Sequence, residues 1–340
     1  MALTIQRDDS VLAAGFTRWL TRHRDLSDVG VVGLDRPPAG YSSETVIVQM
    51  AWSGEGRRHA GSFVIRMAPC GEGTFPHYDL LAQWQAQMAA AGAGVPVADP
   101  VVESDPGWLG APFLVMPRVD GHIIGAVARH DRWLGRQTGP DRELVYRNFI
   151  ATLSDIHRAD ADAAPEVPRR DNASELDYWD GYLRWSSDGS PVTVLAEALE
   201  WCRRNRPATE PEPTLLWGDP RLENVMFGDD LAPLAVLDWD MTSIGPPEHD
   251  LAWFTAHEMT MDHLFGGTAG GAPTRGATVM LFEQGEGRPV RDLDWYETLA
   301  MVRSAAVMTR IGYLRRRAGE PPILPIDDNP ILDLVKSRIA

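Results

Sequence analysis

The sequence predicts an α+β protein with a small, strand-rich N-terminal lobe and a larger, mainly helical C-terminal lobe. The chain has 340 residues, which is more than one hydrophobic core usually takes. Strand-like segments dominate its first third, and helical periodicity dominates after Gly121. Pro117 and Gly121 interrupt both patterns. We therefore place the N-terminal lobe at residues 1–117 and the C-terminal lobe at residues 118–340.

The first lobe is expected to begin with an amphipathic helix. Apolar residues recur at helical spacing between residues 10 and 20, and Ser10 is a candidate cap. Short apolar segments rich in β-branched residues follow, and we expect strands at 29–34, 45–52, 62–67 and 112–116. The polar, glycine-bearing turn at 53–58 predicts a hairpin between the second and third of them. A helix is expected over 79–91, where Gly92 and Pro96 mark its end.

In the second lobe we expect helices around one short strand-rich segment, called the island below. Apolar residues on one face predict a helix that runs from Leu144 to about His157, and we expect His157 to be a hydrogen-bonded core residue. Further helices are expected at 176–185, 194–203, 247–263 and 292–317. The island between Leu215 and Asp238 interrupts them. No internal repeat is present.

The net charge of the chain limits the classes of partner that it is expected to bind. The 32 basic and 48 acidic residues give a formal net charge of -16, which disfavours binding to nucleic acid or to anionic lipid. Lys336 is the only lysine, and it follows a valine rather than a glycine. The position of this one lysine excludes a Walker-type phosphate loop, and its isolation disfavours a mechanism through a lysine Schiff base.

Two further observations indicate a cytoplasmic protein. Cys70 and Cys202 cannot form a disulfide framework, so we expect two reduced thiols. The chain has no run of eighteen apolar residues and no signal-peptide pattern at its start. We therefore expect no membrane span.

Oxygen-bearing side chains cluster in and after the strand-rich island. Asp219 and Asn224 stand five residues apart, and Asp238 ends the next apolar segment. Phosphoryl transfer needs a carboxylate to orient the attacking hydroxyl, oxygen ligands for Mg²⁺, and positive charge against the phosphates. Mg²⁺ usually keeps waters and substrate phosphates, so one carboxylate and one amide from the protein can suffice. An Asp-x4-Asn pair can arise by chance in any loop and by itself indicates nothing. Together with Asp238 at the end of an apolar strand, it indicates a phosphoryl-transfer site.

With Asp250-Leu251-Ala252-Trp253 added, the sequence resembles the aminoglycoside phosphotransferase family, which shares its fold with protein kinases. Residues 39–45 resemble that family's phosphate-covering loop. Residues 63–66 resemble its third strand, and residues 110–121 resemble the strand and hinge between its lobes. The resemblance implies a bilobal, protein-kinase-like fold and an ATP- and Mg²⁺-dependent phosphotransferase that acts on a small-molecule hydroxyl.

The resemblance also implies a role for each matched residue. Asp219 would be the catalytic base, with Arg221 as a phosphate-facing cation; Asn224 and Asp238 would bind Mg²⁺; Ser42, Ser43 and Arg66 would face the ATP phosphates; and Met116 to Val119 would line the adenine slot. Asp250 would brace the catalytic loop. Two positions depart from the family: Trp217 replaces a common His, and Arg66 replaces a lysine. The following helix offers Asp79 and Gln83 as partners for Arg66.

Two functions stay open at this stage. The first is the small-molecule kinase, and the second is a catalytically silent nucleotide-binding protein of the same fold. The acceptor is not readable from the sequence. Glu258 and Asp262, on the helix after Asp250, would suit a cationic aminoglycoside, as would the net charge. The oligomeric state is not readable either.

Overall fold

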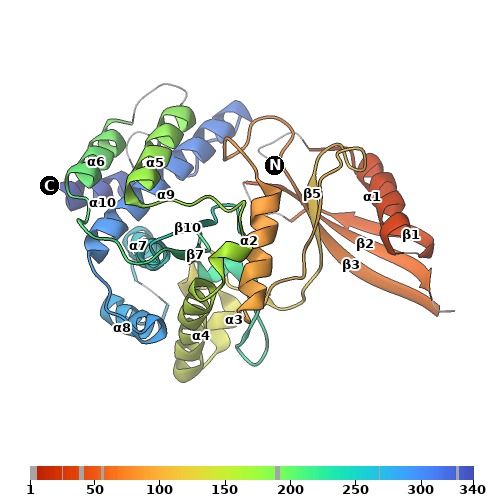
Figure 1. Ribbon diagram of the computed structural model, residues 1–340, viewed down its shortest axis with the longest axis horizontal. Helices are drawn as coiled ribbons and strands as arrows, with labels where there is room; N and C mark the ends of the chain where they lie inside the picture. The colour runs from red at the N-terminus through yellow and green to blue at the C-terminus, as the bar shows by residue number, and fades with distance from the viewer. Residues whose placement is uncertain are drawn as a thin grey trace.

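The computed structural model describes residues 6–24, 26–37, 42–54, 57–187, 192–267, 269–326 and 329–340. Its architecture is the predicted one: a β-sheet forms the N-terminal region, and helices dominate the C-terminal region (Figure 1). β5 ends at Pro117, where we place the boundary between the lobes. Among the described residues, no helix is both long enough and apolar enough to cross a bilayer.

The N-terminal sheet has five strands in the order β1-β2-β3-β5-β4, each pair antiparallel. The strands are β1 (Ser27–Asp35), β2 (Glu44–Gly54), β3 (Arg57–Met67), β4 (Val101–Glu103) and β5 (Phe113–Pro117). The predicted hairpin is β2–β3, but its arms are longer than the sequence indicates, because Gly54 still pairs with Arg57. Backbone pairing continues beyond the apolar residues that signalled each strand, so the turn is shorter than 53–58.

Helix α1 (Asp9–Arg24) covers the sheet with the face that its periodicity predicts. Its four large buried side chains share a core with residues of β2, β3 and β5, and they are Leu12, Phe16, Trp19 and Leu20. The cap differs from our expectation. The carboxylate of Asp8 accepts hydrogen bonds from the backbone N–H groups of Ser10 and Val11, at 2.9 and 3.2 Å. Asp8 therefore caps the helix, and Ser10 lies inside its first turn.

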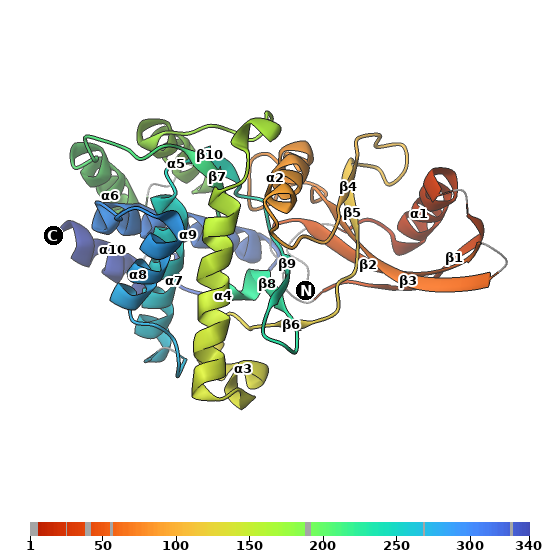
Figure 2. The ribbon, with the colours of Figure 1, turned by 60° about the horizontal axis from the view of Figure 1, so that its bottom comes forward.

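Helix α2 (Leu80–Gly92) lies between the sheet and the helical region in both views (Figures 1 and 2). Asp79 is its N-cap and accepts from the N–H of Ala82 at 2.9 Å. Its buried alanines, including Ala86 and Ala90, belong to the large core of the C-terminal region. Small side chains let the helix approach that core closely. Leu80 instead joins an apolar cluster that contains residues of β5 and β9.

The C-terminal region is built around α7 and α9, which pack against each other. Its helices are α3 (Arg132–Arg136), α4 (Gly139–His157), α5 (Asn172–Ser186), α6 (Thr193–Arg204), α7 (Glu248–Phe265), α8 (Arg275–Glu286), α9 (Leu293–Arg317) and α10 (Pro330–Ile339), with 3-10 turns at Ala128–His130, Ala161–Ala163 and Leu222–Asn224. Its short strands are β6 (His122–Ile123), β7 (Thr214–Leu216), β8 (Val225–Phe227), β9 (Pro233–Val236) and β10 (Ser243–Gly245). β6, β8 and β9 form one small sheet, and β7 pairs with β10.

Helices α8 and α10 are absent from the sequence-based prediction. Helix α8 buries only Thr278 and Phe282, which is too sparse a stripe to signal a helix. Helix α10 had a clearer signal, because Asn329 caps it and Pro330 occupies its first turn. The prediction also starts α4 too late, since Thr138 and Asp141 form a capping box ahead of the apolar face.

Phe282 anchors α8 to the rest of the region. Its ring is fully buried and lies edge-on to His157 of α4, with ring centroids 5.7 Å apart. We expect Phe282→Ala to lower the free energy of unfolding by about 3–5 kcal/mol, because it leaves a cavity under the helix. Met280→Ala, on the exposed side of α8, should change it by less than about 0.5 kcal/mol. Urea unfolding of both variants checks this, and equal effects would contradict it.

Candidate active site

The loop between β7 and β8 is held by one buried carboxylate. Asp250, in the first turn of α7, accepts hydrogen bonds from the backbone N–H groups of Trp217 and Gly218 at 2.8 and 2.9 Å. Gly218 has φ +92°, and a Cβ there would lie 2.1 Å from the carbonyl oxygen of Met241. Only glycine fits this close approach without strain. The geometry agrees with the bracing role that the resemblance implies for Asp250.

Asp250 is itself paired with a buried histidine. His157 lies 3.1 Å through Nε2 from Asp250 and 2.9 Å through Nδ1 from Glu286. His157 is thus the hydrogen-bonded core residue that the sequence predicts. Burial alone would lower the pKa of His157, but Asp250 and Glu286 outweigh it and raise that pKa to about 9. The imidazole is therefore protonated at pH 7 and donates to both carboxylates.

Trp217, which stands where the family commonly has histidine, connects two parts of the site. Its side chain is fully buried, and its indole Nε1–H donates to the carbonyl oxygen of Leu237 at 2.9 Å. The backbone N–H of Leu237 in turn donates to the carbonyl of Asn224 at 2.8 Å. These bonds fix the residue before Asp238 against the loop that carries Asp219. The tryptophan therefore occupies a scaffold position.

Asp219 is held on both of its carboxylate oxygens. Trp253 Nε1–H donates to Oδ1 at 2.6 Å, and Oδ2 accepts from Arg221 at 2.7 Å and from Asn224 Nδ2–H at 3.0 Å. The second bond from Asn224 Nδ2–H goes to the Asp219 carbonyl, also at 3.0 Å. Arg221 reaches a second carboxylate, that of Glu223. Asp219, Arg221 and Asn224 are therefore in direct contact, as the resemblance implies.

Arg66 joins the N-terminal sheet to the end of β9. Its guanidinium pairs with Asp238 at 3.0 Å and with Asp240 at 2.9 Å. Ser43 lies 3.4 Å from the same guanidinium. Ser42 and Ser43 both donate to Asp240. Residues 39–41 of the expected phosphate-covering loop fall outside the described residues.

The partner of Arg66 is not on the helix where the sequence analysis looks for it. Asp79 caps α2, and Gln83 donates through Nε2–H to Asp240 at 2.6 Å instead of pairing with Arg66. Asp240 is thus a site residue that sequence reasoning missed, whereas Gln83 was expected near Arg66 and contacts Asp240 instead. Asp240 lies in the turn after β9, and Asp238 has φ +59°, so the alternation of a strand could not have indicated it.

The two aspartates of this segment differ in their environments. The Asp240 side chain is 4% exposed, and burial, helped by the nearby Asp238, raises its pKa to about 6 despite Arg66. The Asp238 side chain is 31% exposed. Burial opposes its ionisation, but Arg66 outweighs burial, and the pKa of Asp238 is lowered; Arg221 contributes to this from the other side. The two charge clusters, around Asp219 and around Asp238, therefore adjoin.

The proposed adenine residues lie in an apolar cluster next to these charges. Met116 and Val119 share it with Val64 of β3 and with Met226 and Leu237 of the C-terminal region. Val64 is two residues from Arg66, and Leu237 directly precedes Asp238. Val64, Met226 and Leu237 are not among the residues that the sequence predicts for this site, because single apolar residues carry no motif.

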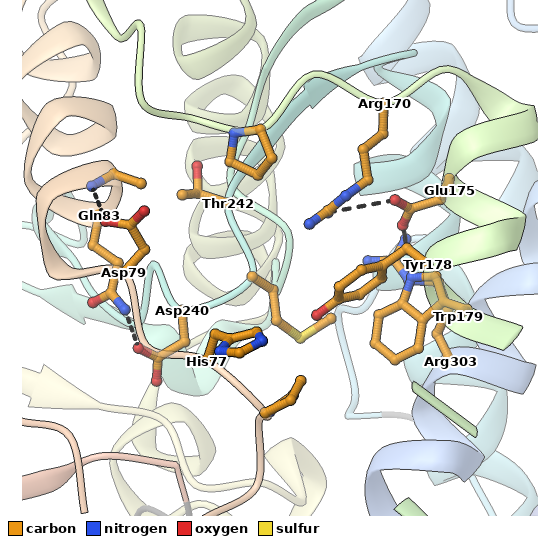
Figure 3. A pocket seen from close by; sticks show the side chains of 14 residues that line it. His77, Asp79, Gln83, Arg170, Glu175, Tyr178, Trp179, Asp240, Thr242 and Arg303 are labelled. Carbon is orange, nitrogen blue, oxygen red and sulfur yellow. Dashed lines mark hydrogen bonds and ion pairs between the residues drawn. The ribbon is translucent and has the colours of Figure 1, made fainter. Parts of the chain in front are cut away.

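Asp240 also lines a cavity of about 180 Å³, which Figure 3 shows. Residues of α2 and Asp240 form one wall, and residues of α5 and α9 form the other. Met241 and Thr242 also line it. Arg170, Glu175 and Arg303 bring charge to the wall opposite Asp240.

The two-lobed fold, with a held aspartate, an asparagine five residues later and a carboxylate after the next strand, defines a protein-kinase-like phosphotransferase. Residues 34–278 match the family model described as "Phosphotransferase enzyme family". This is more than half of the chain, so the chain belongs to that family. Solved aminoglycoside and macrolide phosphotransferases share the fold.

Solved structures agree on the fold. A protein from Ralstonia eutropha JMP134 assigned as an aminoglycoside phosphotransferase superposes with a TM-score of 0.67 at 22% identity, covering 96% of this chain and 94% of that one. Aminoglycoside-3'-phosphotransferase of type VIII gives a TM-score of 0.55 at 17% identity, covering 86% of this chain and 99% of its own. An ADP-bound aminoglycoside phosphotransferase, APH(2'')-Ib, gives 0.54 at 10% identity over 98% and 96%.

Curated relatives are longer proteins. Over 223 residues the chain is 25% identical to "Acyl-CoA dehydrogenase family member 11" of Homo sapiens, which is 64% of this chain and 27% of that protein. The protein of that name from Gallus gallus is 26% identical over 236 residues, or 66% of this chain and 28% of its own. The chain thus spans about a quarter of the length of these relatives.

The ion pair between His157 and Asp250 should make stability depend on pH. The folded-state pKa of His157, about 9, lies above its ordinary value of 6.5, so its contribution is full below pH 6.5 and is lost as the pH rises through about 9. We expect the free energy of unfolding to fall by on the order of 3 kcal/mol between these limits. Urea unfolding at several pH values measures the fall. In His157→Gln the slope in this window should flatten, and an unchanged slope would contradict the assignment.

Proposed function

We propose that this protein is an ATP- and Mg²⁺-dependent kinase that transfers the γ-phosphoryl group to the hydroxyl of a small molecule in the cytoplasm. The carrying observation is that Asp219 and Asn224 are in direct contact while Asp238, beside Arg66, adjoins them. Two free thiols support the cytoplasmic part of the proposal. The family supports phosphoryl transfer to a small molecule, and an ADP complex among the similar structures supports an adenine nucleotide.

Asp219 is the proposed catalytic base. It orients the acceptor hydroxyl and accepts its proton as the acceptor oxygen bonds to the γ-phosphorus and the bond to the ADP oxygen breaks. Trp253, Arg221 and Asn224 hold its carboxylate in place, so little reorganisation is needed. Arg221 supplies positive charge beside the reacting group.

Asn224 and Asp238 are the proposed Mg²⁺ ligands. Asn224 directs its N–H donors to Asp219, which leaves its Oδ1 as an acceptor, and Asp238 keeps part of its carboxylate exposed. Both are hard oxygen donors, which is the set Mg²⁺ prefers. When bound, the ion neutralises charge on the phosphates. Among the described residues, no group of three or more His, Cys, Asp and Glu side chains offers another metal site.

Arg66, Ser42 and Ser43 are the proposed phosphate contacts, and the apolar cluster around Met116 and Val119 is the proposed adenine site. Arg66 can turn from Asp238 toward a phosphate while Asp240 keeps hold of it, because the guanidinium fork has several donors. The more exposed Asp238 is thereby free for the metal ion. Asp240 is in this view the residue that anchors Arg66.

Replacing the proposed base tests the function directly. Asp219→Asn should lower kcat by about 10²–10⁴-fold, because the amide cannot accept the hydroxyl proton. Binding of Mg-ATP, followed by thermal shift, should persist. Asp229→Asn is a matched control, since that carboxylate is 97% exposed and pairs only with His122 among the described residues.

The wild-type protein separates the kinase from the silent nucleotide-binding protein. Stabilisation by Mg-ATP, with neither phosphoryl transfer to an alcohol library nor slow ATP hydrolysis, would favour the silent protein. No response to Mg-ATP would contradict both functions. Full activity of Asp219→Asn would remove the assignment of the base.

Removing the charge of Asp240 tests its role as the anchor of Arg66. Asp240→Asn loses a charge-assisted hydrogen bond to the guanidinium, so the arginine no longer points at the phosphates. We expect the Kd for Mg-ATP to rise about tenfold, or about 1.4 kcal/mol. Isothermal titration with Mg-ATP measures it, again with Asp229→Asn as the control. An unchanged Kd would show that Asp238 alone positions Arg66.

A further inference from the structure

The cavity beside Asp240 has one wall with two arginines whose guanidinium groups donate no hydrogen bond to the described residues. Arg170 lies 3.5 Å from Glu175, and Arg303 lies 3.6 Å from it, which is ion-pair but not hydrogen-bond geometry. Among the described residues, neither guanidinium donates a hydrogen bond, and Arg303 is only 4% exposed. Buried donors are normally satisfied. The wall therefore presents unpaired guanidinium donors, of which those of Arg170 are the more exposed.

Aromatic rings hold the two guanidinium groups in place. Arg170 lies over the ring of Tyr178, 4.0 Å from its centroid. Arg303 lies between Trp179 and Trp253, at 5.1 and 4.9 Å from their centroids. Ring faces stabilise the cations but leave the edges that carry the N–H groups free. In Figure 3 the Arg170 guanidinium points into the cavity, above Tyr178 and across from Asp240.

This wall carries an excess positive charge. Arg170 and Arg303 share one carboxylate, that of Glu175, which Trp179 also holds at 2.7 Å. His249, behind them, is neutral at pH 7, because burial lowers its pKa to about 4. Burial also lowers the pKa of Arg303, and the anions around it do not offset this. The wall thus holds two arginines and one carboxylate, while Asp79 and Asp240 line the opposite wall.

The cavity adjoins the proposed catalytic base. Trp253 contacts both, since its ring lies against Arg303 and its Nε1–H holds Asp219. Asp240 lines the cavity on its other side. Arg303 in the cavity wall is thus separated from Asp219 by one side chain, that of Trp253, and Asp240 is two residues from Asp238.

We propose that this cavity receives the phosphoryl acceptor and that Arg170 and Arg303 select an alcohol bearing an anionic group, a carboxylate or a phosphate. The inference rests on the proposed kinase function and names its substrate class. The guanidinium fork matches the two oxygens of either anion. The acceptor hydroxyl gives its proton to Asp219, and its oxygen forms the bond to the γ-phosphorus as ADP leaves.

The size of the cavity favours a small acceptor. Its volume is about 180 Å³. Sites for drug-sized ligands occupy ~300–1,000 Å³. A polycationic aminoglycoside exceeds this space and would meet the two arginines with like charge. The acidic pair Glu258 and Asp262, which suggested a cationic substrate, does not line this cavity among the described residues.

Matched acceptors test the inference. Short hydroxycarboxylic acids are each compared with their own methyl esters, and sugar phosphates with the free sugars; choline and kanamycin form a cationic set. The 340-residue protein with Mg-ATP is incubated with each, and mass spectrometry detects a gain of one phosphate. We expect transfer to acids or sugar phosphates in preference to their neutral counterparts by at least about tenfold, and no transfer to the cationic set.

The outcomes separate the two proposals. Preference for acids over esters identifies a carboxylate as the anion, and transfer to sugar phosphates alone identifies a phosphate. Equal transfer to acids and esters, or preference for choline or kanamycin, overturns the anionic class while the kinase stands. Stabilisation by Mg-ATP without transfer to any anionic alcohol also overturns it. If Mg-ATP neither stabilises the protein nor supports transfer, the proposed function fails first.

Arg170→Gln assigns the selectivity to this wall. Its side chain is partly exposed, so the variant should fold, which thermal unfolding checks. The KM for the anionic acceptor should rise about 10–100-fold, with a smaller change for the matched ester. Arg169→Gln, at the neighbouring residue, is the control. The Arg169 side chain is exposed and pairs with Asp162, and neither residue lines the cavity. Equal effects of the two variants, or an unchanged KM in Arg170→Gln, would contradict the role of Arg170.

Discussion

The site depends on how a short loop between two strands is kept in one conformation. Asp250 does this with a single buried carboxylate that takes two backbone N–H groups of the loop, and protonated His157 supplies its countercharge. A buried anion is costly unless it is hydrogen-bonded and paired, and here both conditions are met. The position of the proposed base depends on this arrangement, because Asp219 directly follows Trp217 and Gly218, the two residues that Asp250 holds.

The second constraint is the arginine of β3. Arg66 crosses from the sheet to Asp238 and Asp240, and Gln83 of α2 contacts Asp240 rather than the arginine. A lysine is a single point charge, whereas a guanidinium fork binds two carboxylates at once. The substitution therefore moves the counter-ion of the third strand from the neighbouring helix to the segment that carries the proposed metal ligand. The proposed nucleotide site and the contact between the two regions are thereby linked through one side chain.

Net charge does not set the charge of a pocket. The chain has a formal net charge of -16, yet the cavity beside Asp240 has a wall with two arginines and one shared carboxylate. Summed charge governs solubility and long-range attraction, whereas a ligand in a buried cavity responds to the few groups within its reach. This is why an acidic composition and acidic residues on α7 pointed to a cationic acceptor, while the cavity geometry points to an anionic one.

Local patterns were enough for much of this protein. The periodicity of α1 and the apolar, β-branched composition of β2 and β3 predict those elements. The spacing of Asp219, Asn224 and Asp238 predicts the loop that carries the site, because these signals depend only on near neighbours in the chain. Helix α8 buries too few side chains to be seen in this way. Asp240, Gln83, Arg170 and Arg303 come from four separate segments, and their roles depend on contacts across long stretches of sequence. Only the tertiary structure decides which charges are shared, which donors are left unpaired, and which small space they surround.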